Sequence, residues 1–233
     1  DTVAEKRGYP ENLEYMPPFT WFCYRWAHAR GRLANIKTPF VEYAQKTRQS
    51  AQRSNEGAVL HPGPGNKGSL LIDGLQSYAA TMAQAGSLSG DDTLFQEAVD
   101  QYRLHRDILR DPQTGLWSQG RGWEKDPDAI SPGAWSRGHG WLMRGLAECL
   151  HHVPRKSNHW DDLAKILFEL ANDLAALRDD QGLWHALLHL PQDRSPAESS
   201  GSALLAGALG QAVALNILRA DPWSERVRQT AHA

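Results

Sequence analysis

Hydrophobic residues recur at the spacing of an α-helix along most of the chain, and two kinds of helical segment alternate. Segments 70–85, 131–150 and 200–218 are largely apolar on all sides. Segments 92–111 and 158–178 keep one polar face. An apolar helix must be covered on every side, and an amphipathic helix can cover it from outside. The alternation therefore predicts helical hairpins, each with an inner and an outer helix.

Three more helices are predicted outside these segments. Residues 12–32 repeat aromatic side chains every three or four positions, which favours a buried helix. Thr38 and Pro39 form a typical helix start, and this more polar helix runs to about Ser54. A last helix begins at Pro222. Loops rich in Gly and Pro separate the helices, and no β-hairpin signal is present, so the expected fold is all-α.

The hairpin is repeated within the sequence. DPQTGLW at 111–117 recurs as DDQGLW at 179–184, and AWSRGHGWLMRGL aligns with AESSGSALLAGAL downstream. LLIDGLQSYA fits the same frame, so that Asp73, Arg137 and Ser200 share one position of the repeat. A closed ring of hairpins, an α/α toroid, would gather these side chains at one mouth. An open solenoid would leave them touching only the next repeat.

The start of the 131–150 segment carries the densest candidate chemistry. Trp135, Arg137, His139 and Trp141 are separated by single small residues. Indole faces stack on sugar rings, a guanidinium binds carboxylates with two parallel donors, and a helix N-terminus attracts anions. The set fits an acidic sugar. The alternative is a tight helix–helix contact in which Trp fills space and Arg caps the helix.

Composition limits the partners of the chain. Its 233 residues suffice for one domain over 1–233. The 25 basic and 27 acidic residues nearly balance, so no nucleic-acid partner is expected, and no apolar run is long enough for a membrane span. No metal-ligand spacing is present. No signal peptide is visible, which favours the cytoplasm, but the chain opens at Asp1 and a processed N-terminus stays open.

Four ordered segments resemble the unsaturated uronyl hydrolases, which are glycoside hydrolase family 105 and the related family 88. WSRGHGW is similar to the family signature W-x-R-G-x-G-W, and IDGLQSY resembles the helix start that carries an essential Asp. DPQTGLW followed by GRGW is similar to the D-x-x-T-G-L-aromatic loop that ends in Gly-Trp-Asp. GLWHAL with AESSGSALL resembles a G-L-W…E-x-S-G-S-A segment. Together these segments span about Leu70 to Leu218.

The resemblance implies an (α/α)6 barrel and an unusual hydrolysis. The substrate would be an oligosaccharide, left by a polysaccharide lyase, that ends in a 4,5-unsaturated uronic acid. A carboxylic acid protonates C4 of the enol-ether double bond, water adds at C5, and the hemiketal opens with loss of the glycosidic bond. No metal or organic cofactor is implied.

The resemblance also implies two catalytic carboxyls. Asp73 corresponds to the first family Asp. The main general acid of the family follows the Gly-Trp of the loop, and this chain has Glu124 there, after Trp123. Glu is longer than Asp by one methylene, and a misplacement of about 1 Å costs an acid about 100-fold in rate. The proton donor therefore stays open among Glu124, Asp126 and Asp73.

Other residues of the resemblance are expected to bind substrate. Arg137 would bind the uronate carboxylate or orient a catalytic carboxylate. One of Trp135 and Trp141 would stack on the sugar while the other packs, and His139 would contact a sugar hydroxyl. Ser200 would donate to the substrate or cap its helix. Trp123 is expected in the wall of the same pocket.

The sequence accounts for about four hairpins where the family has six. An incomplete ring would expose apolar inner helices, so a partner such as a second copy, a partial chain or a degenerate relative stays open. Two rival functions also stay open. One is an ordinary inverting glycosidase on the same fold, and the other is a carbohydrate-binding relative without catalysis.

Overall fold

A computed structural model of the chain describes residues 37–61, 68–122 and 126–233. The helix predicted at 12–32 and the candidate residues Trp123 and Glu124 lie outside these ranges. The helices and strands are α3 (Lys37–Ser50), β1 (Leu70–Leu71), α4 (Asp73–Ser89), α5 (Asp92–Leu109), β2 (Gly120–Arg121), α6 (Ser136–His152), α7 (Asn158–Ala175), η1 (Gln192–Arg194), α8 (Ser199–Ala214) and α9 (Ala220–His232).

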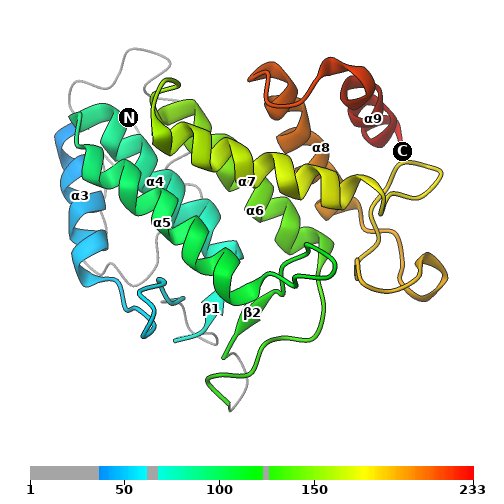
Figure 1. Cartoon of the computed structure of the whole chain (residues 1–233), viewed down its shortest axis with the longest axis horizontal. Helices are drawn as coiled ribbons and strands as arrows, with labels where there is room; N and C mark the ends of the chain where they lie inside the picture. The colour runs from blue at the N-terminus through cyan, green and yellow to red at the C-terminus, as the bar shows by residue number, and fades with distance from the viewer. Residues whose placement is uncertain (1–36, 62–67, 123–125) are drawn as a thin grey trace, which may run out of the picture.

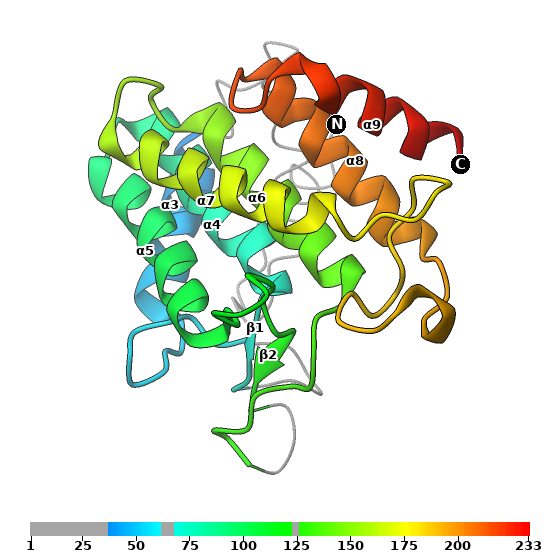
Figure 2. The same cartoon turned by 45° about the vertical axis from the view of Figure 1, so that its right-hand side comes forward.

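The helices form two layers, as the predicted hairpins require. Inner helix α4 packs on α6, and α6 packs on α8. Each inner helix also contacts the outer helix that follows it, in the pairs α4–α5, α6–α7 and α8–α9. The hairpins therefore follow one another side by side from cyan to red (Figures 1 and 2). This is the all-α arrangement of an α/α toroid, of which the described residues build three consecutive hairpins preceded by α3.

Small residues let the inner helices approach closely. A Cβ added at Gly145 of α6 would lie 2.7 Å from Cα of Gln76 on α4. A Cβ added at Gly140 would lie 2.7 Å from the Leu204 Cβ of α8. A side chain cannot occupy either place without moving a neighbouring helix. Glycine is thus the residue that sets the distance between inner helices.

The outer helices α5 and α7 are amphipathic and capped by side chains. Helix α5 follows Asp91, whose carboxylate accepts from the Thr93 N–H at 3.0 Å, and α7 follows Ser157, whose hydroxyl accepts from the Trp160 N–H at 3.2 Å. Such caps supply partners for free N–H groups of the first turn. The inward face of α7 buries Leu163, Ile166, Leu167, Leu170 and Leu174. None of the described helices is long and apolar enough to cross a bilayer.

The structure corrects the prediction at the start of α4. Residues 70–71 do not begin the helix but form β1, which pairs antiparallel with β2 through Leu70–Arg121 and Leu71–Gly120. The helix begins only at Asp73. Two-residue strands are too short to show an alternating pattern, and their partners lie 50 residues apart along the chain. Both strands lie at the end of the molecule where α4 and α6 begin (Figure 1).

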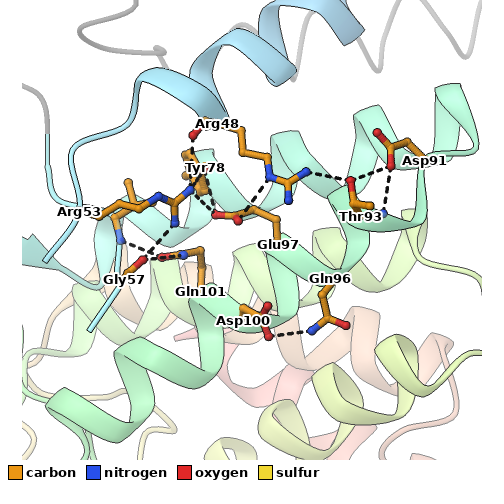
Figure 3. Close-up of polar contacts among 11 residues, drawn as sticks. Arg48, Arg53, Gly57, Tyr78, Asp91, Thr93, Gln96, Glu97, Asp100 and Gln101 are labelled. Atoms are coloured by element: carbon orange, nitrogen blue, oxygen red, sulfur yellow. Dashed lines mark hydrogen bonds and ion pairs between the residues drawn. The ribbon is translucent and has the colours of Figure 1, made fainter. Parts of the chain in front are cut away.

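A polar network fixes the loop between α3 and β1 to the first hairpin (Figure 3). Glu97 of α5 is only 9 % exposed, and its Oε1 accepts from Arg53 Nη2 at 2.9 Å and from the Tyr78 hydroxyl at 3.0 Å. Gln101 accepts from the Val59 N–H at 2.8 Å. Buried charge is tolerated when it is paired and hydrogen-bonded in this way. The network therefore holds residues 51–61 of this loop against the first hairpin.

Candidate active site

The carboxyl of Asp73 lies in the first turn of α4 and is mostly buried. Its Oδ1 accepts a hydrogen bond from Gln119 Nε2 at 2.9 Å. Burial raises the pKa of Asp73 above its ordinary value, although the Gln119 hydrogen bond and the charges of Arg137 and His61 act in the opposite direction. A carboxyl with a raised pKa holds a proton closer to neutral pH, as a general acid must.

The guanidinium of Arg137, in the first turn of α6, pairs with the carboxylate of Glu198. Its Cζ is 3.8 Å from the centroid of the Trp135 ring, and its Nη1 is 3.6 Å from Glu198 Oε1. Its charge also acts on Asp73. The Arg137 side chain remains 39 % exposed, so it is both oriented and accessible. The stacked, paired guanidinium is suited to bind a further anion from solvent.

Glu198 caps α8 and stays ionised. Its carboxylate accepts from the Gly201 N–H and, at 2.5 Å, from the Ser200 hydroxyl. Burial raises its pKa, but the hydrogen bonds from Ser200 and Gly201 and the charge of Arg137 outweigh burial, so that the pKa is lowered. Ser200 is exposed and donates to this cap. The pKa values of Asp73 and Glu198 are thus shifted in opposite directions, and Asp73 is the carboxyl suited to carry a proton.

His139 does not have the geometry of a sugar-binding residue. It is fully buried, its Nε2 accepts from the Trp117 N–H at 3.0 Å, and its Nδ1 lies 2.9 Å from the Trp135 carbonyl. A carbonyl can only accept, so Nδ1 carries the proton and the ring is neutral. Neither nitrogen is left for a hydroxyl of the substrate. The sugar-binding role predicted for His139 is therefore replaced by anchoring of the loop that ends at Trp117.

The same anchor recurs one repeat later, which confirms the predicted register. Ser202 stands at the position of His139, and its hydroxyl accepts from the Trp184 N–H at 2.9 Å. Trp117 and Trp184 each pair with the end of the preceding outer helix, through bridges to Arg110 and Arg178. Both indoles are almost fully buried. The repeated Gly-Leu-Trp segments are thus loop anchors rather than sugar-binding platforms.

Two buried histidines predict that acid destabilises the fold. Burial lowers the pKa of His105 and of His139 to about 4, from 6.5. The unfolded chain therefore binds more protons than the folded one between pH 6.5 and 4, and stability is lost as pH falls through that window. Urea denaturation at pH 7.5, 6.0, 5.0 and 4.5 should show a falling midpoint. His139→Gln, which does not titrate, should show a shallower decline, and an equal decline would contradict the assignment.

The structure gives fewer contacts for the remaining predicted site residues. Trp141 is half-buried in the first turns of α6, and Trp135 is half-buried under Arg137. Asp126 is exposed, and its Oδ1 accepts from the Asp128 N–H at 2.9 Å. Trp123 and Glu124 lie outside the described residues. The structure therefore brings together Asp73, Arg137, Trp135 and Ser200 from the predicted set.

Sequence analysis missed three residues of this site, namely Gln119, His61 and Glu198. The main chain of Gln119 pairs with the start of α4, and its side chain bonds Asp73. His61 acts on the same carboxyl from the loop before β1. Glu198 shares its repeat position with Trp135. The last of these carried a usable signal, because an acidic residue just before Ser-Ser-Gly-Ser is a typical helix cap.

His185 and His189, which lie four residues apart, both have partners within the protein. His185 lies 3.0 Å from Asp179 Oδ2 and also contacts the Ser195 carbonyl, and His189 accepts from the Ala134 N–H at 3.2 Å. Within residues 37–61, 68–122 and 126–233, no group of three His, Cys, Asp or Glu side chains is arranged to hold a metal ion.

The sequence matches one family over its whole length. The family described as Glycosyl Hydrolase Family 88 matches residues 1–233. The chain belongs to glycosyl hydrolase family 88. No curated protein matches this family 88 chain in sequence.

Solved structures place the family 88 chain among longer relatives. A Klebsiella pneumoniae protein described as a possible member of the GH105 family has 27% identity, a TM-score of 0.79 and 97% coverage of this chain. A Salmonella enterica protein with the same description has 25% identity, a TM-score of 0.80 and 98% coverage. The unsaturated glucuronyl hydrolase of Bacillus sp. GL1 has 20% identity, a TM-score of 0.65 and 86% coverage, which shows the shared fold.

The chain spans only part of each relative. It covers 60% of the Klebsiella and Salmonella proteins and 56% of the Bacillus enzyme. The three consecutive hairpins described here therefore correspond to part of each of these longer proteins.

Proposed function

We propose that this family 88 chain forms the proton-donating mouth of a hydrolase that removes a terminal 4,5-unsaturated uronic acid from lyase-generated oligosaccharides. The observation that carries the proposal is the meeting of a mostly buried Asp73 and an accessible Arg137 at the starts of adjacent inner helices. The unsaturated glucuronyl hydrolase among its structural relatives supports the substrate class.

The geometry fits hydration of an enol ether. Asp73 delivers its proton to C4, water adds at C5, and the proton released by that water returns to the Asp73 carboxylate. The resulting hemiketal opens and releases the aglycone, so the net change is addition of one water. Glu124 is the second candidate for either proton transfer. A carboxyl with a raised pKa suits the first step because it is protonated closer to neutral pH.

Arg137 supplies recognition of the acidic sugar. A uronate carboxylate can bind the accessible side of the guanidinium while Glu198 and Trp135 hold the opposite side. Helix α6 begins without a side-chain cap from the described residues, so the N–H groups of its first turn add positive potential there. The Ser200 hydroxyl, which donates to Glu198, can still accept from the neighbouring sugar, and the half-buried Trp141 can contact the same sugar.

The test is incubation with unsaturated disaccharides of pectin or glycosaminoglycan origin. Loss of the ultraviolet absorbance of the conjugated uronate, together with release of the reducing-side sugar, would support the proposal. Release of sugars with the absorbance retained would indicate an ordinary glycosidase. A shift in melting temperature with no chemical change would indicate a carbohydrate-binding protein. Either of the last two results would overturn the proposed reaction.

A further inference from the structure

We propose that Gln119 is the positioning residue of Asp73, and that its side-chain amide serves the carboxyl in both protonation states by exchanging donor for acceptor. This inference rests on the proposed function, because it assigns a role in the proton transfer at Asp73. It adds a residue from the loop of the first repeat to a site otherwise built from helix starts.

The main chain places Gln119 rigidly beside Asp73. The Gln119 carbonyl accepts from the Ile72 N–H at 3.1 Å, and the next residue pairs with Leu71 in the two-stranded sheet. The Gly120 N–H also donates to the Ser131 hydroxyl at 3.0 Å. On the other side of Gln119, the Ser118 N–H donates to the Leu109 carbonyl at 2.8 Å, so main-chain bonds fix the segment on both sides of the side chain. The short sheet that sequence analysis missed is what holds Gln119 against the start of α4.

The Gln119 side chain is enclosed at this position. Gln119 is 4 % exposed, and its Nε2 donates to Asp73 Oδ1 at 2.9 Å. A Cβ added at Gly138 would lie only 2.0 Å from Gln119 Oε1, so the amide fills the space left by a glycine of α6. The amide is therefore enclosed between α4 and α6 and points at the carboxyl.

The other end of the amide is unsatisfied. Gln119 Oε1 is buried and has no hydrogen-bond partner among the residues that the structure describes. A buried acceptor without a partner is destabilising. When Asp73 is protonated, rotation of the amide by about half a turn brings Oε1 to the carboxyl, where it accepts the acid O–H. One side chain can thus support the ionised and the protonated acid in turn.

The neighbours of Asp73 shift its pKa in opposite directions, so a partner that suits both protonation states is useful there. Burial favours the neutral acid, whereas Arg137 from α6 and His61 from the loop before β1 favour the carboxylate. The Gln119 Nε2 donor also favours the carboxylate. A general acid must pass through both states in each turnover. A partner that can donate or accept lets the carboxyl change state without moving away from the substrate.

Nuclear magnetic resonance of the protein tests the contact directly, without substrate. The ¹³C resonance of the Asp73 carboxyl and the ¹⁵N resonance of the Gln119 side chain should titrate with one shared midpoint. In Gln119→Leu, which lacks the donor, the Asp73 midpoint should rise by about 1 pH unit. Gln119→Glu should raise it further, because a second carboxyl repels the carboxylate. Gln84→Leu, which removes a buried glutamine elsewhere on α4, should leave it unchanged.

Steady-state kinetics distinguish a positioning role of Gln119 from a general contribution to the stability of the fold. In Gln119→Leu, kcat should fall about 10- to 100-fold while KM changes less than about threefold, and the alkaline limb of the pH–rate profile should move with the Asp73 midpoint. A folded Gln119→Leu and a folded Gln119→Glu with wild-type midpoints would overturn the inference. If the midpoints shift but the wild type hydrolyses no unsaturated uronate, the contact stands and the proposed function fails.

Discussion

Asp73→Asn should lower kcat on an unsaturated disaccharide about 1,000-fold, which is within the usual contribution of a general acid. Asparagine keeps the size of the side chain, and its carbonyl can still accept from Gln119 Nε2. The fold should therefore be retained, and KM should change little, because the loss concerns a proton that only the carboxyl can deliver. Steady-state loss of absorbance, with circular dichroism as a check of folding, measures the effect.

Asp126→Asn is the matched control for this variant. Asp126 is an exposed carboxyl of the loop that the family resemblance also admits as a proton donor. If Asp73 carries the proton, Asp126→Asn should retain activity within about threefold, as substitutions at exposed positions usually do. A large loss in Asp126→Asn with near-normal activity in Asp73→Asn would transfer the role of proton donor to the loop.

Arg137→Lys should lower kcat/KM about 30- to 100-fold, mostly through KM. Lysine keeps the positive charge but loses the planar fork that binds a carboxylate through two hydrogen bonds and stacks on Trp135. Hydrogen bonds to charged groups typically contribute about 1.5–3 kcal/mol, or about 10- to 150-fold, which includes this range. The same assay, run over a range of substrate concentrations, separates KM from kcat.

Arg106→Lys on the outer helix α5 provides a control for the loss of a guanidinium as such. Arg106 pairs with its neighbour Asp107 at 3.1 Å, far along the chain from the inner-helix starts. The Arg106→Lys variant should therefore show wild-type kinetics. A loss in Arg137→Lys confined to kcat, with KM unchanged, would argue that Arg137 orients a catalytic carboxylate instead of binding the uronate.

The fold was largely predictable because its signal is periodic. Helices α5 and α7 begin at the predicted residues Asp92 and Asn158, since a capping side chain and an apolar stripe are both local features. Helix α8 ends at Ala214, four residues before the predicted end. Asn216 adopts a positive φ of 56° there, which the apolar pattern does not reveal. Helix ends are set by such single residues, whereas helix identity is set by many.

Residues of the site were predictable only where they share one position of the sequence repeat. Alignment of the repeats brought Asp73, Arg137 and Ser200 to one position, and the described structure gathers them at the starts of the inner helices. The family resemblance suggested a substrate role for His139, because a motif cannot show which side of a helix start faces a neighbouring loop. Gln119 carried no motif of its own. Its place depends on a β-pairing between distant segments, which sequence patterns do not encode.

The shared anchor of the Gly-Leu-Trp loops bears on how such a protein can diversify. His139 and Ser202 have little chemistry in common, yet each accepts from the backbone N–H of the tryptophan in its own Gly-Leu-Trp segment. Because the position needs only a hydrogen-bond acceptor, one repeat can exchange the residue type there without displacing its loop. The turn just ahead of the anchor is then free to carry a cation in one copy, at Arg137, and a hydroxyl in the next, at Ser200. An asymmetric catalytic centre can in this way arise within a symmetric architecture.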